Sequence, residues 1–220
     1  MFKKLGAILL ASFIIGANAS AAVIVLDFEG LDDQESIQGF YNGGTSANGN
    51  SGTNFGVEFS SNSLSIIDQD AGGTGNFGGE PSPSTVLFFL TGAAAIMNVA
   101  AGFDTGFSFF YSAVNQAGSV DVWDGLNGTG TLLATLLLPV TPSDGGDPNG
   151  SFSPFFAIGV GFAGIAQSVS FAGVQNQIAF DDVTFGAVEP GTLPVPEPGT
   201  LALLGLGLLG IGFSRRNKKA

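Results

Sequence analysis

The sequence predicts an all-β domain, built as an antiparallel sandwich of two sheets, between two targeting segments. The 220 residues include 35 Gly and 21 Phe, and 45% of them are hydrophobic. Along the middle of the chain, short apolar runs alternate with breaks rich in Gly, Asn and Ser, as expected for short strands joined by tight turns. Residues that favour helices, such as Lys, Arg, Gln and Glu, are scarce there.

The strand-like runs of the middle segment predict roughly eight to eleven strands, a number typical of a sandwich. The runs 57–59 and 64–67 are predicted to pair as a hairpin across 60–63. The run 93–99 fits a strand or one helical turn. In the run 103–113, Phe107, Phe109 and Tyr111 alternate and should share one face. The remaining runs are 23–28, 85–90, 119–123, 131–138, 155–162, 168–171 and 177–185.

Charge is distributed unevenly along the chain. Of the 18 acidic residues, 17 lie between Val23 and Glu189, where there is no Lys, Arg or His, so this segment carries a formal charge of −17. Such a domain repels the phosphates of nucleic acids, and nucleic-acid binding is excluded as a function class. The chain also lacks Cys and His, which removes thiolate and imidazole sites for zinc, haem and iron–sulfur clusters.

Residues 1–21 are predicted to be a secretory signal peptide. Lys3 and Lys4 form its charged start, and an apolar run from Leu5 to Gly16 follows. Small residues at Ala17 and Ala19 suit signal peptidase, which we expect to act after Ala19, with Ala21 as an alternative. The other interpretation is a membrane anchor, but the apolar run is short for a membrane span. The domain boundaries that follow are 22–189 for the sandwich, 190–199 for a Pro-rich linker and 200–220 for a membrane tail.

The C-terminal tail has three parts in a fixed order. Pro196, Glu197 and Pro198 precede an apolar run of 15 residues, 199–213, which as a helix reaches roughly 22 Å. This short transmembrane helix is followed by a basic cluster that should stay cytoplasmic, leaving the domain outside. The cluster consists of Arg215, Arg216, Lys218 and Lys219.

Taken together, these parts resemble the PEP-CTERM sorting signal. An ordinary C-terminal anchor is the alternative. The resemblance implies recognition by an exosortase of a Gram-negative bacterium that makes exopolysaccharide. It also implies an inner-membrane intermediate, held through the tail, and delivery to the outer envelope or extracellular matrix.

A second resemblance concerns the domain itself. It opens on Asp27-Phe28-Glu29 and closes on the strand 177–185, which contains Asp181 and Asp182. This arrangement resembles jelly-roll modules of the MAM and carbohydrate-binding type, although MAM modules usually carry paired cysteines and this chain has none. The resemblance implies a jelly-roll-like sandwich.

The adjacent carboxylates Asp181 and Asp182 point to opposite faces of a strand whose two faces are both apolar nearby. At least one should therefore lie near the core, where a carboxylate needs hydrogen bonds, a cation or protonation. Oxygen ligands suit Ca²⁺, and in related jelly rolls a structural Ca²⁺ ties the first strand to the last. The candidate calcium ligands are thus Asp27, Glu29, Asp181 and Asp182. The alternative is a pair held by solvent or by backbone N–H groups at a bulge.

Catalysis finds little support in the sequence. With no His, Cys or Lys in the domain, a Ser nucleophile has no usual base. Trp123 alternates with the apolar Val122 and is the candidate sugar contact, with core packing as the alternative. The sequence therefore predicts a non-enzymatic envelope or matrix protein associated with exopolysaccharide or biofilm. The alternatives are a carbohydrate-binding module with a defined sugar site and, more remotely, a glycosidase that uses a pair of carboxylates.

Overall fold

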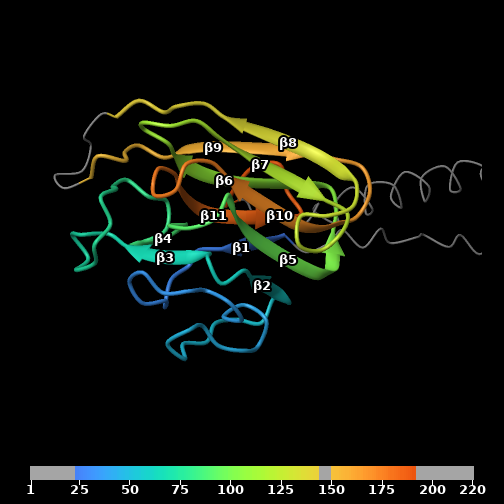
Figure 1. The fold of residues 1–220 in the computed structure, drawn as a ribbon, viewed down its shortest axis with the longest axis horizontal. Coiled ribbons are helices and arrows are strands. Elements are labelled where there is room, and N and C mark those ends of the chain that lie inside the picture. The colour runs from blue at the N-terminus through green and yellow to red at the C-terminus, as the bar shows by residue number, and fades with distance from the viewer. Residues whose placement is uncertain (1–22, 144–149, 192–220) are drawn as a thin grey trace, which may run out of the picture.

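The computed structural model describes residues 23–143 and 150–191, which fold into two facing antiparallel sheets (Figure 1). The strands in these residues begin and end close to the predicted runs, because alternation of apolar and polar residues is a local signal. They are β1 (Ile24–Leu26), β2 (Val57–Phe59), β3 (Leu64–Ile67), β4 (Thr85–Phe88), β5 (Ala94–Phe103), β6 (Gly106–Ser112), β7 (Gly118–Trp123), β8 (Leu132–Leu138), β9 (Phe156–Gly161), β10 (Ala166–Ala172) and β11 (Ala179–Phe185).

One sheet has the order β3-β4-β11-β6-β9, with β1 also paired to β11, and the other has the order β2-β5-β10-β7-β8. All the pairings between these strands are antiparallel. The predicted all-β, two-sheet sandwich is therefore confirmed. The predicted hairpin of β2 with β3 is wrong, because β2 pairs with β5 and β3 pairs with β4, in different sheets. The turn between them instead carries the chain across the sandwich.

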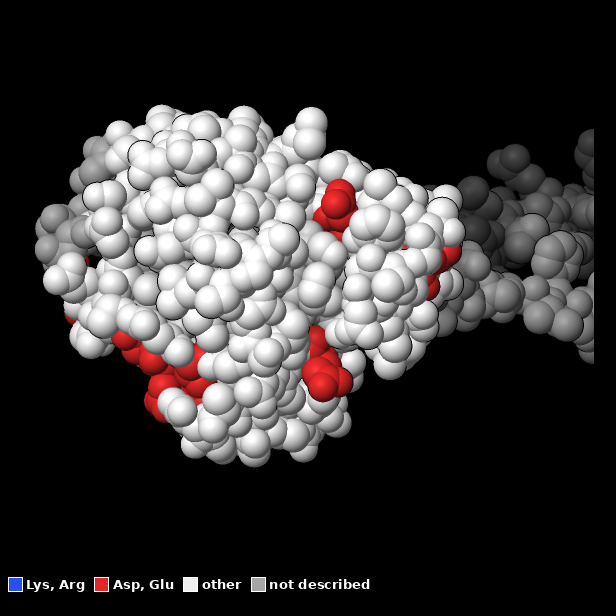
Figure 2. All heavy atoms as spheres, in the orientation of Figure 1, with Lys and Arg blue, Asp and Glu red and all other residues white. Residues whose placement is uncertain are grey.

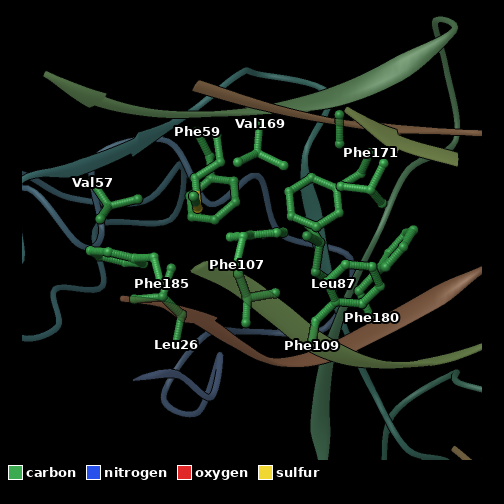
Figure 3. Close-up of a cluster of buried hydrophobic side chains, with 14 of the residues drawn as sticks. Leu26, Val57, Phe59, Leu87, Phe107, Phe109, Val169, Phe171, Phe180 and Phe185 are labelled. Carbon is green, nitrogen blue, oxygen red and sulfur yellow. The ribbon is translucent and has the colours of Figure 1, made fainter. Parts of the chain in front are cut away.

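The core between the sheets is dominated by phenyl rings (Figure 3). Phe107 and Phe109 of β6 face Phe171 of β10, with centroid distances of 6.0 Å in both cases. Phe180 of β11 packs on Phe171 at 5.0 Å with an interplanar angle of 67°, an edge-to-face contact. Phe107, Phe109 and Tyr111 are all buried, as their predicted shared face requires. Aromatic pairs in this geometry add about 0.5–1.5 kcal/mol each beyond the area they bury.

Strand β11 changes partner half-way along its length. Its first half pairs with β4 through Phe180, and its second half pairs with β1 from Val183 to Phe185. Along the opposite edge it pairs with β6, with a register shift between Asp181 and Thr184. Asp182 at this irregularity has φ +46°, in the left-handed region. A bulge of this kind re-aims neighbouring side chains, and here it separates the environments of Asp181 and Asp182.

Several sequence predictions concern residues outside the described ranges. These are the signal-peptide helix of 1–21, the transmembrane helix and basic cluster of 200–220, and the motif at Pro196, Glu197 and Pro198. Within residues 23–143 and 150–191, no helix is long and apolar enough to cross a membrane. The core residues of the described ranges all lie between Leu26 and Phe185, and the domain boundaries 22–189 stay a prediction.

Candidate functional site

Asp181 lies at the centre of a buried polar cluster between β11 and the segment that precedes β4. Its side chain is 0% exposed. Its Oδ2 accepts a hydrogen bond from the Ser82 N–H at 2.8 Å, and its Oδ1 accepts one from the Asp182 N–H at 2.7 Å. The Ser82 hydroxyl lies 2.7 Å from Oδ1. Two backbone N–H groups, one of them at the bulge, thus hold this carboxylate, which matches one of the alternatives that the sequence left open.

Burial raises the pKa of Asp181 to about 7, against the lowering effect of the hydrogen bonds from Ser82 and in concert with the charge of Asp182. Burial also raises the pKa of Asp182, and the charge of Asp27 adds to this rise. The cluster contains a tyrosine as well. Tyr41 Oη accepts a hydrogen bond from the Phe28 N–H at 2.8 Å and lies 3.5 Å from Asp27 Oδ1. Burial, followed by the charge of Asp27, raises the pKa of Tyr41.

Glu29, one of the predicted calcium ligands, accepts hydrogen bonds from backbone N–H groups at the start of β4. Its Oε1 accepts hydrogen bonds from the N–H groups of Ser84 and Thr85 at 2.9 and 2.8 Å. These bonds attach the start of β4 to the segment that follows β1. Ser82 also attaches this segment to its neighbours. Its hydroxyl lies 3.0 Å from the Asp27 carbonyl oxygen and is close to Asp181. The 82–85 segment is therefore fastened between the first and last strands by protein contacts.

The four predicted calcium ligands differ in how far their oxygens are already engaged in hydrogen bonds. Within the described residues, no group of three or more His, Cys, Asp or Glu is arranged to hold a metal ion. Glu29 and Asp181 already accept hydrogen bonds from backbone N–H groups. Asp27 and Asp182 are close enough for the charge of Asp27 to raise the pKa of Asp182. Calcium binding by Asp27, Glu29, Asp181 and Asp182 stays a prediction.

Trp123 lies on the outer side of its sheet, opposite the buried Val120 and Val122 of the same strand, and is half-buried. The hairpin loop between β7 and β8 folds back over this outer face. Gly128 N–H donates to Ser168 Oγ at 2.9 Å, and the Ser168 hydroxyl donates to the Gly125 carbonyl. The Trp123 Nε1 atom is buried without a hydrogen-bond partner. The indole nitrogen is thus shielded from solvent, and contact of Trp123 with a sugar stays a prediction.

A buried carboxylate that the sequence did not single out organises the loop after β1. Glu35 accepts hydrogen bonds from Asp32 N–H and Asn48 N–H, both at 2.7 Å, and from Asn50 Nδ2 at 2.9 Å. Burial acts to raise the pKa of Glu35, but hydrogen bonds, with that of Ser46 first among them, lower it below its usual value. This carboxylate stabilises an irregular loop. In the sequence, its only distinguishing feature is its position close to other acidic residues.

A cleft of about 310 Å³ opens where several loops meet the start of β11. The described part of its lining combines phenyl rings with side-chain amides and contains no charged residue. The rings are those of Phe77, Phe88 and Phe152, and the polar groups are those of Thr74, Asn76, Asn115, Asn176 and Gln177; Ile66, Ile178 and Ala179 complete the lining. No alternation or spacing in the sequence marks these residues, because they come from separate segments.

A second, more polar groove of about 680 Å³ crosses the outer face near β2. Asn98 and Asn127 hydrogen-bond to each other across it, Asn98 Nδ2 to Asn127 Oδ1 at 3.0 Å and Asn127 N–H to Asn98 Oδ1 at 2.8 Å. Glu58 lies in the groove with its side chain exposed. In contrast to the cleft, this groove has a carboxylate in its wall and its facing amides are already paired.

Acidic side chains form separate groups on the face shown in Figure 2, with broad uncharged areas between them. No basic side chain belongs to the described residues, since Lys and Arg occur only before Leu5 and after Ser214. The domain therefore has an entirely negative field, which favours uncharged or cationic ligands.

A family model described as the PEP-CTERM protein-sorting motif matches residues 194–216. The chain carries a PEP-CTERM sorting signal. The match includes Pro196, Glu197 and Pro198 as well as Arg215 and Arg216, and it confirms the resemblance seen in the sequence. A PEP-CTERM protein is an exosortase substrate, exported through a membrane-anchored intermediate in a Gram-negative bacterium.

Comparisons beyond the PEP-CTERM signal add little about function. No curated protein matches the sequence. Among solved structures, the K3 cleaved adhesin domain of Lys-gingipain from Porphyromonas gingivalis W83 is similar over 76% of this chain and 100% of its own length, at 13% identity and a TM-score of 0.36. A TM-score of this size supports no conclusion about function.

Proposed function

We propose that this PEP-CTERM protein is a non-catalytic domain that is sorted to the outer envelope or extracellular matrix and associates there with exopolysaccharide. The sorting signal at residues 194–216 is the observation that carries the proposal. A signal peptide at residues 1–21, removed by signal peptidase, would supply the first step of export. The domain then reaches a compartment in which polysaccharide is an abundant partner.

The residues of the domain support a non-catalytic role. Between Val23 and Glu189 there is no imidazole, thiol, amine or guanidinium group, so nucleophilic catalysis lacks its usual bases. The buried carboxylates Asp181 and Glu35 are engaged in holding the chain together. The exposed carboxylates give the surface a negative charge that divalent cations would screen, and such cations would also bridge it to anionic polysaccharide.

The proposal is tested in the native host by fractionation. The chain should appear in the envelope or matrix fraction and should co-sediment with purified exopolysaccharide. Replacing Pro196-Glu197-Pro198 by alanines should leave it in the inner membrane, whereas the matched change of Pro190 to alanine should not. Recovery of the altered chain in the matrix would contradict sorting through this motif. Absence of the natural chain from every polysaccharide fraction would contradict the association.

A second candidate function is a carbohydrate-binding module with a defined sugar site, and the cleft of rings and amides is the observation that favours it. Saturable binding of one saccharide distinguishes this function from diffuse, cation-dependent association. The remote alternative, a glycosidase with a carboxylate pair, predicts hydrolysis that a single Asp or Glu substitution abolishes. Such turnover would contradict both non-catalytic functions.

A further inference from the structure

We infer that the cleft between Phe77, Phe152 and Asn176 is a binding site for one neutral sugar unit, an inference that rests on the second candidate function, a carbohydrate-binding module, and names its sugar site. The volume of about 310 Å³ is at the lower end of the range for small-molecule sites. It suits a single ring or a chain terminus better than a long chain.

The lining matches the two kinds of surface that a sugar ring presents. Phe152 is half-buried and gives apolar surface for the C–H face of a pyranose ring, while Phe77 and Phe88 are buried and form the apolar base of the cleft. Side-chain amides surround these rings. An amide both donates and accepts hydrogen bonds, as a sugar hydroxyl does.

The amides retain unused hydrogen-bonding capacity. Asn76 Oδ1 accepts from Ser151 N–H at 3.0 Å, and its own N–H donors have no partner among the described residues. Gln177 Nε2 donates to the Asn176 carbonyl at 2.8 Å, which leaves its oxygen as an acceptor. Within the described residues, the side-chain amides of Asn115 and Asn176 form no hydrogen bond. The cleft therefore offers both donors and acceptors at its rim.

The backbone around the cleft is held in place before any ligand arrives. Asn176 has φ +56° and donates its N–H to the Phe89 carbonyl at 2.9 Å. Glycine would satisfy this left-handed position equally well, but asparagine adds an amide to the cleft. On the opposite wall, Phe152 N–H donates to the Asn76 carbonyl at 3.0 Å, and Phe77 and Phe152 form a parallel bridge. A site held in this way loses little conformational entropy on binding.

The charge of the domain restricts which ligands would bind in the cleft. Among the described residues, no charged side chain lines the cleft, while the surrounding domain carries a formal charge of −17. Uronate, phosphate and sulfate groups would be repelled. A lipid tail would leave the rim amides without partners, which is costly when they lose water. A neutral, hydroxyl-rich ligand avoids both costs.

The experiment titrates the full-length chain with glucose, galactose and mannose, and with glucuronic acid as the anionic comparison, by isothermal calorimetry. The detergent must have no sugar head group. The cleft variant combines Asn115→Ala with Asn176→Gly, which removes two amides and keeps the left-handed backbone. The matched control is Asn127→Gly, which makes the same change at another position of positive φ, +59°, in the polar groove.

We expect one of the neutral hexoses to bind saturably, the cleft variant to bind it about tenfold more weakly because two hydrogen bonds are lost, and the control to bind it as the natural chain does. Three results would overturn the inference: no saturable binding of any of these hexoses, equal binding by the cleft variant, or loss of binding only in Asn127→Gly. Glucuronic acid bound as tightly as the hexoses would also overturn it. If Asn176→Gly alters the fold, Asn115→Ala alone decides, since Asn115 is exposed.

Failure of this inference is distinguishable from failure of the proposed function. A chain that co-sediments with exopolysaccharide but binds no hexose in the cleft retains its matrix role and loses only this site. A chain that does neither loses both.

Discussion

Replacing Asp181 by asparagine should remove most of the pH dependence of the protein's stability between pH 4 and pH 8. The side chain is fully buried, and burial raises its pKa to about 7, whereas an unfolded chain has an Asp pKa of about 3.9. Asparagine has nearly the same shape and does not titrate. The comparison therefore isolates the proton that Asp181 retains in the folded state.

The magnitude follows from the two pKa values. One pKa unit corresponds to about 1.4 kcal/mol, so a difference of about three units corresponds to about 4 kcal/mol. Below pH 4 the carboxyl is protonated in both states and contributes nothing to pH dependence. Between pH 4 and pH 7 the unfolded chain releases the proton while the folded chain keeps it, so the free energy of unfolding falls as pH rises. Above pH 7 the carboxyl is deprotonated in both states, and the free energy of unfolding no longer changes with pH.

The assay is urea denaturation at intervals from pH 4 to pH 8, followed by the fluorescence of Trp123, the single Trp of the chain. The natural protein should lose about 4 kcal/mol relative to Asp181→Asn across this range. Because the amide replaces one acceptor oxygen, it also changes the hydrogen bonds with Ser82 and Asp182. That change is independent of pH and does not affect the slope.

The matched control is Glu58→Gln, which removes one negative charge from an exposed position on β2. It should follow the natural protein within about 1 kcal/mol at each pH. Parallel profiles for the natural protein and Asp181→Asn would refute the reasoning. So would a natural protein that gains stability relative to Asp181→Asn as pH rises.

Three further predictions concern calcium, the core and a buried hydroxyl. If Ca²⁺ binds only the folded form, millimolar Ca²⁺ at about 100 times the dissociation constant should stabilise the protein by about 2.7 kcal/mol relative to EDTA, and Asp182→Asn should abolish the melting shift; no shift in the natural protein contradicts calcium binding. In urea denaturation, Phe171→Ala should cost about 3–5 kcal/mol, because its ring is 0% exposed. Phe156→Ala, at a ring that is 38% exposed, should cost much less, and equal costs would contradict the assigned core. Tyr41→Phe leaves the Phe28 N–H, now bonded at 2.8 Å, without a partner and should cost about 1–3 kcal/mol; unchanged stability would show that water replaces the hydroxyl.

The sequence predicts where strands lie better than which strands pair. The alternation that places Phe107, Phe109 and Tyr111 on one face is local, and the structure buries all three. The pairing of β2 with β3 is wrong because the intervening turn is fixed from elsewhere. Ser60 N–H donates to the carbonyl of Ile96, which lies far along the chain. Short loops between alternating runs suggest hairpins, but contacts distant in sequence decide whether the chain turns back or crosses to the other sheet.

The polar sites, like the strands, could be predicted only where the signal is local in the sequence. Two acids in an apolar strand indicated that a carboxylate lies near the core, and Asp181 does so. Which acid is buried depends on the bulge at Asp182, where φ is +46°, and no sequence signal marks it. The cleft could not be predicted, since Asn76, Asn115 and Asn176 come together only after the loops between different strands are placed. The composition of these loops is ordinary and does not indicate a cleft.

The absence of Lys and Arg between Leu5 and Ser214 has a practical consequence. Trypsin cleaves only after these residues, so it finds no site in the domain whether the domain is folded or unfolded. Survival in trypsin is therefore no evidence that this protein is folded, and a protease that cuts after its 21 Phe residues is needed to measure opening of the structure. A tryptic digest of a bacterial matrix would yield one very large fragment, so standard proteomic surveys would overlook this protein even where it is abundant.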